Sequence, residues 1–100
     1  MTLHGIDIPK ERLAAFCRRH GIRRLSLFGS ILRDDFREDS DIDVLVEFEP
    51  GTRVGLAFIA MQDELTAILG RRVDLSTAGF LSARFRDEVL AEAEAVYVAA

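Results

Sequence analysis

Apolar side chains recur along this chain with two different periods, which indicates alternating helices and strands. Spacings of three and four residues are typical of one face of an amphipathic helix, whereas short apolar runs and strict alternation are typical of strands. Three segments have the helical spacing and three have the strand pattern. The pattern predicts helices over residues 9–20, 54–69 and 81–98, and strands over residues 22–28, 41–48 and 72–75.

Residue types at the ends of the expected helices support these limits. Pro9 suits a first helical turn, where its missing N–H would have no partner, and Gly21 and Gly70 suit the positions that end helices. Ser82 is expected to cap the last helix with its side-chain oxygen. Tyr97, the only tyrosine, falls on the apolar stripe expected for that helix.

Helices that alternate with short strands predict an α/β (α+β) fold, in which a small mixed β-sheet is covered by helices. No internal repeat, low-complexity tract or flexible linker divides the sequence. We therefore expect residues 1–100 to form a single domain around one core. The pattern leaves the direction of each strand open.

Composition and charge narrow the classes of function. Apolar residues make up 49% of the chain and charged residues 30%, which suffices for a globular core and a solvated surface. The net charge of −4 argues against a protein that wraps nucleic acid by neutralising its phosphates. Cys17 has no second cysteine to pair with, and no apolar run approaches the roughly 20 residues of a membrane span. We expect a cytoplasmic protein with no membrane partner and no bulk nucleic-acid binding.

The segment GSILRDDFREDSDID, which begins at Gly29, has the composition of a phosphate-binding turn. Gly29 lets backbone approach a ligand closely, and Ser30 begins a turn whose free N–H groups and hydroxyl can hold phosphate oxygens. An ordinary turn at the end of a strand is the alternative. Residues 31–40 are expected to form a short helical turn and then a loop, in which Arg33 and Arg37 can each pair with a phosphate or with neighbouring acids.

Three aspartates on two expected strands form the other half of this candidate site. Asp41 and Asp43 are two residues apart on a strand, so their side chains project on one face, where their oxygens can bind hard divalent cations. Asp74 lies between Val73 and Leu75, where a charge is costly unless it is paired or coordinated. If the two strands are neighbours, three carboxylates can hold two Mg²⁺ ions for transfer of a nucleotide from a triphosphate. Asp74 is then the group expected to accept the proton of the attacking hydroxyl.

Other polar and apolar residues have ordinary structural explanations beside a functional one. His4 and His20 lack metal-ligand spacing and are expected at the surface or at a helix end. Arg71 and Arg72 are expected to be solvated at the start of a strand, with a phosphate or partner contact as the alternative. The loop acids expected to cap turns rather than bind metal are Asp34, Asp35 and Asp39. The apolar residues for which core packing and a nucleobase or partner surface both stay open are Leu56, Phe58, Ile59 and Met61.

The spacing of these motifs resembles that of a known superfamily. Gly29-Ser30, then ten residues, then Asp41-Ile42-Asp43 is the GSx10DxD signature of the DNA polymerase beta nucleotidyltransferase superfamily, and the chain resembles its minimal (MNT) branch. The similarity continues through SDIDVLVEFEPG, GRRVDL and FLSARFRDEVLAEAEAVY, so it covers nearly all of the sequence. It implies a nucleotidyltransferase fold, Mg²⁺ binding by Asp41, Asp43 and Asp74, and phosphate contacts from the Gly-Ser pair.

Members of this branch of similar length resemble antitoxins that are encoded beside HEPN-domain ribonuclease toxins. The resemblance implies an enzyme that transfers AMP from ATP to a tyrosine of a HEPN partner and forms a hetero-oligomer with it. No acceptor-binding segment accompanies the catalytic pattern, so a partner would bring the acceptor. Two alternatives stay open: a non-catalytic antitoxin that neutralises its partner by binding, and nucleotidyl transfer to a small molecule or an RNA end.

Overall fold

A computed structural model describes residues 1–100 as a four-stranded sheet, a two-stranded hairpin and three α-helices. Two short 3-10 helices connect elements near the sheet. The elements in chain order are β1 (Thr2–Leu3), β2 (Ile6–Asp7), α1 (Lys10–His20), β3 (Ile22–Phe28), the 3-10 helix η1 (Gly29–Leu32), β4 (Ile42–Phe48), α2 (Ala57–Leu69), β5 (Val73–Ser76), the 3-10 helix η2 (Ala78–Phe80), α3 (Ala83–Glu92) and β6 (Glu94–Val98).

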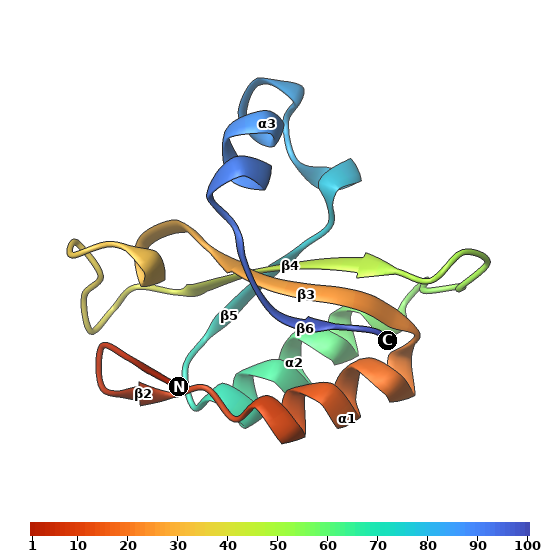
Figure 1. Ribbon diagram of the computed structural model, residues 1–100, viewed down its shortest axis with the longest axis horizontal. Coiled ribbons are helices and arrows are strands. Elements are labelled where there is room, and N and C mark those ends of the chain that lie inside the picture. The colour runs from red at the N-terminus through yellow and green to blue at the C-terminus, as the bar shows by residue number, and fades with distance from the viewer.

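The sheet has the strand order β5-β4-β3-β6 (Figure 1). β4 pairs in parallel with β5, while β3 pairs antiparallel with both β4 and β6. The sheet is therefore mixed, which confirms the expected α/β architecture. The parallel pair matters most for the site, because it sets the last of the three aspartates beside the first two.

One face of the sheet is closed by α1 and α2, which lie together beneath it in Figure 1. Apolar side chains from this face and from both helices form one core cluster. Burying one such side chain contributes about 1.5–3 kcal/mol, so this face supplies most of the stability. The largest fully buried members are Phe16, Ile8, Leu13, Leu25, Leu27, Ile31, Ile42 and Leu65.

The C-terminal segment differs from the expectation of one helix over residues 81–98. The helix α3 ends at Glu92, Ala93 has an extended ψ of 135°, and β6 then pairs with the free edge of β3. Val96 and Tyr97 pack against the core cluster from this strand, so the placement of Tyr97 on a helical stripe was wrong. β-branched and aromatic residues favour strands, and an unpaired strand edge offers them hydrogen-bonding partners. Long-range pairing with β3, rather than the local helical spacing, therefore determines the structure of this segment.

The other expected helices are confirmed with small changes at their ends. Gly21 and Gly70 both adopt the left-handed conformation after α1 and α2. The Ser82 side chain accepts a hydrogen bond of 3.3 Å from the Arg84 amide, which confirms the expected cap. The second helix begins at Ala57, whereas the spacing predicted a start at residue 54.

The β1–β2 hairpin was not expected from the sequence. His4 and Gly5 form its two-residue turn, and both have positive φ angles of 52° and 77°. Paired positive φ angles give a turn twist that matches antiparallel strands, so the His-Gly pair between two apolar residues is the signal that could have revealed it.

None of the three α-helices has the length and apolar character that a membrane-spanning helix needs.

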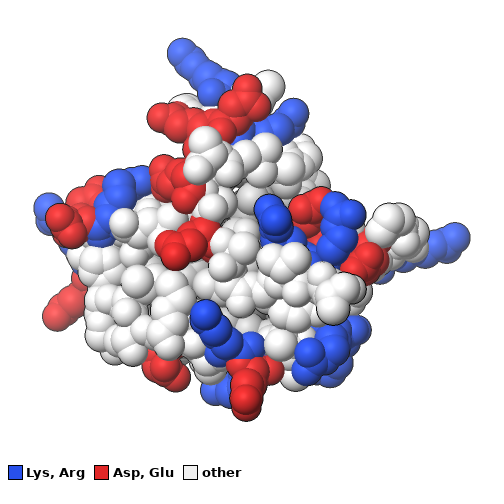
Figure 2. Space-filling view, in the orientation of Figure 1, with Lys and Arg blue, Asp and Glu red and all other residues white.

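Charges of both signs lie side by side in the space-filling view (Figure 2). In that view the blue and red side chains gather around the rim and over the α3 segment, and uncharged atoms cover much of the middle. The visible face has no continuous basic surface of the kind that tracks a nucleic-acid backbone.

Candidate functional site

The sheet face opposite α1 and α2 carries the acidic residues. On β4, Ile42 and Val44 are fully buried in the core, and Asp43 between them is directed to the other face. On β5, Val73 and Leu75 are buried in the same way, and Asp74 between them is exposed. The alternation of each strand therefore presents a carboxylate on the face that the two helices leave free.

The parallel pairing of β4 and β5 brings two of the predicted aspartates to the same level. Asp43 and Asp74 are register partners, so their Cα atoms lie directly across from each other. Asp41 precedes β4 by one residue and lines, together with Asp74, a shallow cavity of about 360 Å³ at the β5 edge. Gln62 and Asp63 of α2 contribute to the same cavity. The structure thus brings the three aspartates into one neighbourhood.

The glycine turn meets this cluster at Asp43. Gly29 has a φ of +75°, and a Cβ atom placed on it would lie 2.2 Å from Asp43 Oδ2. Any side chain here would collide with that carboxylate and would also strain the backbone. Phe28, which precedes the turn, is the register partner of Asp43 across the antiparallel pair. Glycine is therefore required at this position because the turn and the carboxylate touch.

Burial raises the pKa of Asp43 to about 6. The negative charges of Asp74, Asp41 and Glu92 act in the same direction, while the Arg33 guanidinium opposes them. A half-buried carboxylate surrounded by other carboxylates is held at a cost in free energy. Such an arrangement is typical of functional sites, where a bound cation can relieve the repulsion.

The three aspartates are near one another without forming a closed ligand shell. No group of three or more carboxylate, imidazole or thiol side chains in this structure is gathered tightly enough to hold one metal ion. Oxygen-rich sites for Mg²⁺ use few protein carboxylates and complete the coordination with water and substrate phosphates. The roles of Asp41, Asp43 and Asp74 as metal ligands therefore stay predictions.

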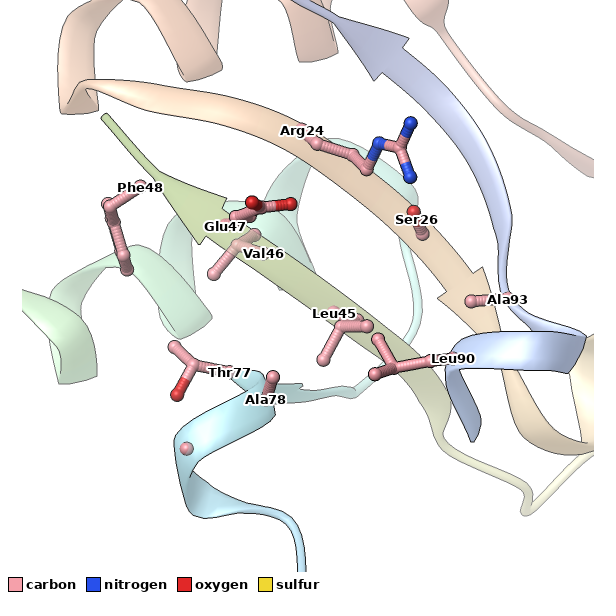
Figure 3. Close-up of a pocket in the computed structure, with 11 residues that line it drawn as sticks. Arg24, Ser26, Leu45, Val46, Glu47, Phe48, Thr77, Ala78, Leu90 and Ala93 are labelled. Atoms are coloured by element: carbon pink, nitrogen blue, oxygen red, sulfur yellow. The ribbon is translucent and has the colours of Figure 1, made fainter. Parts of the chain in front are cut away.

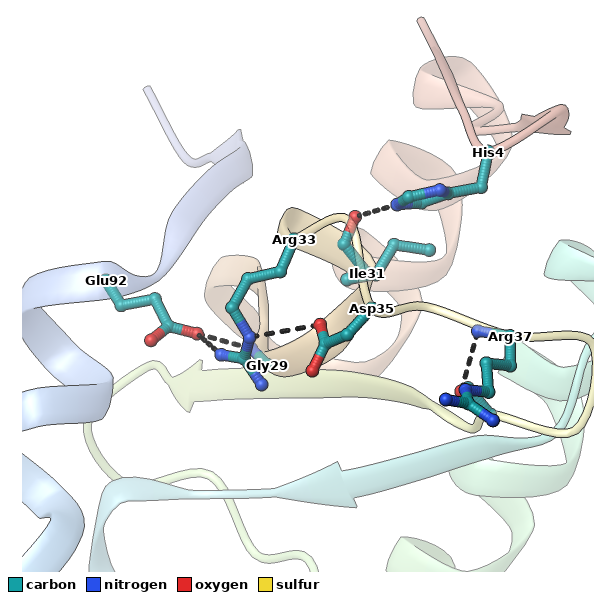
Figure 4. Close-up of polar contacts among 8 residues, drawn as sticks. His4, Gly29, Ile31, Arg33, Asp35, Arg37 and Glu92 are labelled. Atoms are coloured by element: carbon teal, nitrogen blue, oxygen red, sulfur yellow. Dashed lines mark hydrogen bonds and ion pairs between the residues drawn. The ribbon is translucent and has the colours of Figure 1, made fainter.

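Arg33 pairs with two acids in this structure, as Figure 4 shows. Its Nε donates to Asp35 Oδ1 at 3.3 Å, and its NH1 group donates to Glu92 Oε1 at 3.2 Å. The same Glu92 oxygen accepts a hydrogen bond of 2.8 Å from the Gly29 amide. Of the two alternatives left open for Arg33, the structure has the ion pairs with acids. Glu92, at the end of α3, is a site residue that the sequence analysis missed.

One residue outside the signature, Arg71, holds the loop between the glycine turn and β4. The Arg71 guanidinium donates to the carbonyls of Arg37, Glu38 and Ser40 at 2.9, 2.7 and 2.8 Å. It also lies 4.9 Å from the centre of the Phe36 ring. Arg71 was expected to be solvated, and no local sequence signal could have revealed this role, because its partners lie more than 30 residues away.

His4 and His20 both have structural partners, and His20 lies at a helix end as expected. The ring Nε2 of His4 lies 3.1 Å from the carbonyl oxygen of Ile31 in η1. His20, at the end of α1, lies 3.0 Å from Glu64 Oε1. Burial raises the pKa of the Cys17 thiol to about 12, so this side chain stays protonated in the core.

A groove of about 490 Å³ lies further along β4 on the same sheet face (Figure 3). Leu45, two residues after Asp43 on β4, lines it, and Leu90 of α3 faces Leu45 across it. The remaining wall includes Thr77 and Ala78, and Ser26 lies on the β3 side. The sheet face that carries Asp43 therefore also carries a groove with both apolar and polar walls.

The sequence is similar to those of known nucleotidyltransferase proteins. The sequence model of the nucleotidyltransferase domain matches residues 10–96. The chain is 42% identical over 80 residues to the protein adenylyltransferase MntA of Thermococcus cleftensis, covering 80% of this chain and 78% of that protein. It is 37% identical over 89 residues to a candidate protein adenylyltransferase of Methanocaldococcus jannaschii, covering 89% of this chain and 95% of that protein.

Solved structures share the architecture. One described as a candidate minimal nucleotidyltransferase has 41% identity and a TM-score of 0.71, with 85% of this chain and 86% of that chain covered. A toxin-antitoxin complex with AMP-PNP has a TM-score of 0.73 at 20% identity, with 92% of this chain and 75% of that chain covered. At that identity the second likeness shows the fold alone.

Proposed function

This chain belongs to the nucleotidyltransferase domain family, and from that membership we propose that it transfers AMP from ATP to a tyrosine of a HEPN-type ribonuclease toxin. It would thereby act as the antitoxin of that partner and form a hetero-oligomer with it. The observation that carries the proposal is the meeting of Asp43, Asp74 and the Gly29 turn on the open sheet face. Relatives named protein adenylyltransferases, and a toxin-antitoxin structure described as a tri-AMPylated HEPN toxin with its MNT antitoxin, support the choice of reaction and partner.

The nucleotide phosphates are assigned to the turn that begins with Gly29 and Ser30, with Arg33 as an additional donor. Backbone N–H groups of a tight turn and a guanidinium are suitable partners for phosphate oxygens. Gly29 and Arg33 already bind a carboxylate oxygen in this structure, which supports an anion site at these donors. The nucleotide would then lie with its phosphates beside Asp43.

Asp41, Asp43 and Asp74 are assigned as ligands of two Mg²⁺ ions. Their hard oxygen donors suit Mg²⁺, and their mutual repulsion at Asp43 is the electrostatic state that a cation relieves. When bound, such ions supply charge neutralisation at the triphosphate and at the leaving pyrophosphate. In the transfer, the acceptor oxygen forms a bond to the α-phosphorus, the bond to pyrophosphate breaks, and Asp74 takes the proton of the acceptor hydroxyl.

The acceptor would approach along the groove side of the sheet. The other face is closed by α1 and α2, whose apolar side chains fill it. The groove beside Leu45 and Leu90 lies on the same face as Asp43 and gives a partner access to it. Residues 1–100 would supply the catalytic domain, and the partner would supply the tyrosine. The compartment that we propose with this reaction is the cytoplasm, where the Cys17 thiol would stay reduced.

Labelling of the partner tests this proposal. Radiolabelled ATP, Mg²⁺, the chain and the HEPN protein encoded beside it should give a labelled partner. The double variant Asp41→Asn/Asp43→Asn should give none, whereas Asp39→Asn removes a nearby exposed loop carboxylate and should label as the wild type does. Undiminished labelling by the double variant would show that these two aspartates are not needed for the transfer. A double variant that fails to label but still neutralises the toxin would instead favour inhibition by binding.

A further inference from the structure

The Glu92 carboxylate occupies the donors that the proposed function gives to the nucleotide phosphates (Figure 4). Its Oε1 atom accepts from the Gly29 amide at 2.8 Å and from the Arg33 guanidinium at 3.2 Å. The residue lies 63 positions after Gly29, so the contact is a feature of the tertiary structure. A carboxylate of the protein itself is thus bound at the glycine turn, which is the turn proposed to bind phosphate.

A carboxylate oxygen and a phosphate oxygen compete for such donors. Both are anionic acceptors, and each forms its shortest hydrogen bonds with charged or backbone N–H groups. The Glu92 carboxylate and a phosphate cannot both bind these donors, because two adjacent anions repel each other. Asp43 adds further negative charge beside them. The contact of Glu92 with Gly29 and the binding of a phosphate at Gly29 therefore exclude each other.

The helix that carries Glu92 can move at little cost. No residue of α3 is buried, and Figure 1 shows α3 standing away from the sheet. The Arg86 guanidinium bonds to the carbonyls of Ala78 and Leu81, which belong to the segment leading into α3. Glu92 makes the only side-chain hydrogen bonds from α3 to the glycine turn. Segments with few buried apolar contacts open with low free energy, so release of Glu92 would loosen the attachment of α3 to the glycine turn, while β6 keeps the end of the helix at β3.

We propose that Glu92 is an internal competitor for the phosphate turn, so that α3 closes the site until a nucleotide displaces its carboxylate. This inference rests on the proposed nucleotide site and adds a self-inhibitory contact to it. The apparent affinity for the nucleotide is therefore set by how much more tightly the turn binds a phosphate than it binds the Glu92 carboxylate. The affinity of the open turn alone does not determine it. Nucleotide binding is also coupled to the freedom of α3, which lines the groove through Leu90.

Calorimetric titration of the chain with Mg²⁺ and AMP-PNP, in the absence of a partner, tests the competition. Glu92→Gln and Glu92→Ala should each tighten binding about three- to tenfold, as expected for loss of a competing charged hydrogen bond. Glu88→Gln is the matched control, because it removes the same charge one turn earlier on α3 from a side chain without a contact to the turn. In the nucleotide-free protein, the Gly29 amide proton resonance should move upfield in Glu92→Ala but not in Glu88→Gln.

The possible results separate the inference from the proposed site. Affinity in the Glu92 variants equal to that of Glu88→Gln would overturn the competition while leaving the nucleotide site in place. Weaker binding would place Glu92 among the groups that hold the nucleotide, which also overturns the competition. No uptake by wild type and variants alike would overturn both the nucleotide site and the inference drawn from it.

Discussion

The two faces of the sheet contrast along a single strand. Val44 on β4 is fully buried among apolar neighbours, whereas Asp43 beside it is half-buried among carboxylates. Burial raises the pKa of Asp43 to about 6. On β5, buried Leu75 follows exposed Asp74 in the same way. One face gains free energy from burial, and the other holds charges that cost free energy. Stability and chemistry should therefore respond to different substitutions only one residue apart.

The largest expected effect tests the acidic face. Asp74→Asn should lower the initial rate of partner labelling about 10²–10³-fold, or ~3–4 kcal/mol, because it removes the assigned proton acceptor and a cation ligand. Asp63→Asn is the matched control, since Asp63 lines the same cavity from α2. It should change the rate by less than about threefold. Equal losses in both variants would mean that the cavity needs negative charge in general and that Asp74 has no special role.

The helix-covered face should respond to truncation with a loss of stability. Leu27→Ala removes a fully buried side chain from β3 and should lower the free energy of unfolding by about 3 kcal/mol, within the usual range for such cavities. Ser26→Ala, one residue earlier on the opposite face, removes only a hydroxyl from a buried side chain that lines the groove and should change it by less than about 1 kcal/mol. Urea titrations followed by circular dichroism measure both. A cost for Ser26→Ala comparable to that for Leu27→Ala would break the distinction between the faces.

The raised pKa of Asp43 predicts a gain of stability on removing its charge. The folded pKa of about 6 lies above the ordinary value of 3.8, so the protonated carboxyl carries no penalty below pH 3.8, and stability is lost as the pH rises through 6. A shift of this size corresponds to ~3 kcal/mol, which solvent screening of a half-buried group reduces to about 1–2 kcal/mol.

Asp43→Asn should therefore be more stable than wild type at pH 7.5 in EDTA and about equal to it at pH 3.5. Thermal unfolding at the two pH values measures the difference. A stabilisation that is the same at both would assign the effect to packing or hydrogen bonding rather than to charge.

The smallest expected effect concerns α3, which has no buried residues and contacts the glycine turn through Glu92. Ser82→Ala removes the N-cap and should cost about 1 kcal/mol in the local stability of this helix. Amide hydrogen exchange should quicken in residues 83–92, while protection of β3 and β4 stays as in the wild type. Parallel losses in those strands would show that α3 is coupled to the core more closely than its exposure indicates.

Much of the fold was predictable because its signals are local. The helix over residues 9–20, the strand over residues 22–28 and the glycine stop at Gly21 were all expected and are confirmed. The error over residues 81–98 arose because alanine and glutamate in that segment give helical spacing, while only the free edge of β3 favours a strand over Glu94–Val98. Sequence spacing does not reveal which edge is unpaired.

By itself, the sequence determined which residue types stand at which intervals, and this was enough to mark Gly29, Ser30, Asp41, Asp43 and Asp74 as one candidate site. The tertiary structure alone decided that β4 and β5 run in parallel with Asp43 opposite Asp74, and that Glu92 reaches the Gly29 amide from 63 residues away. The reason is physical. Turn and strand signals come from neighbours in the chain, whereas strand register and side-chain contacts across the fold come from how the whole core packs.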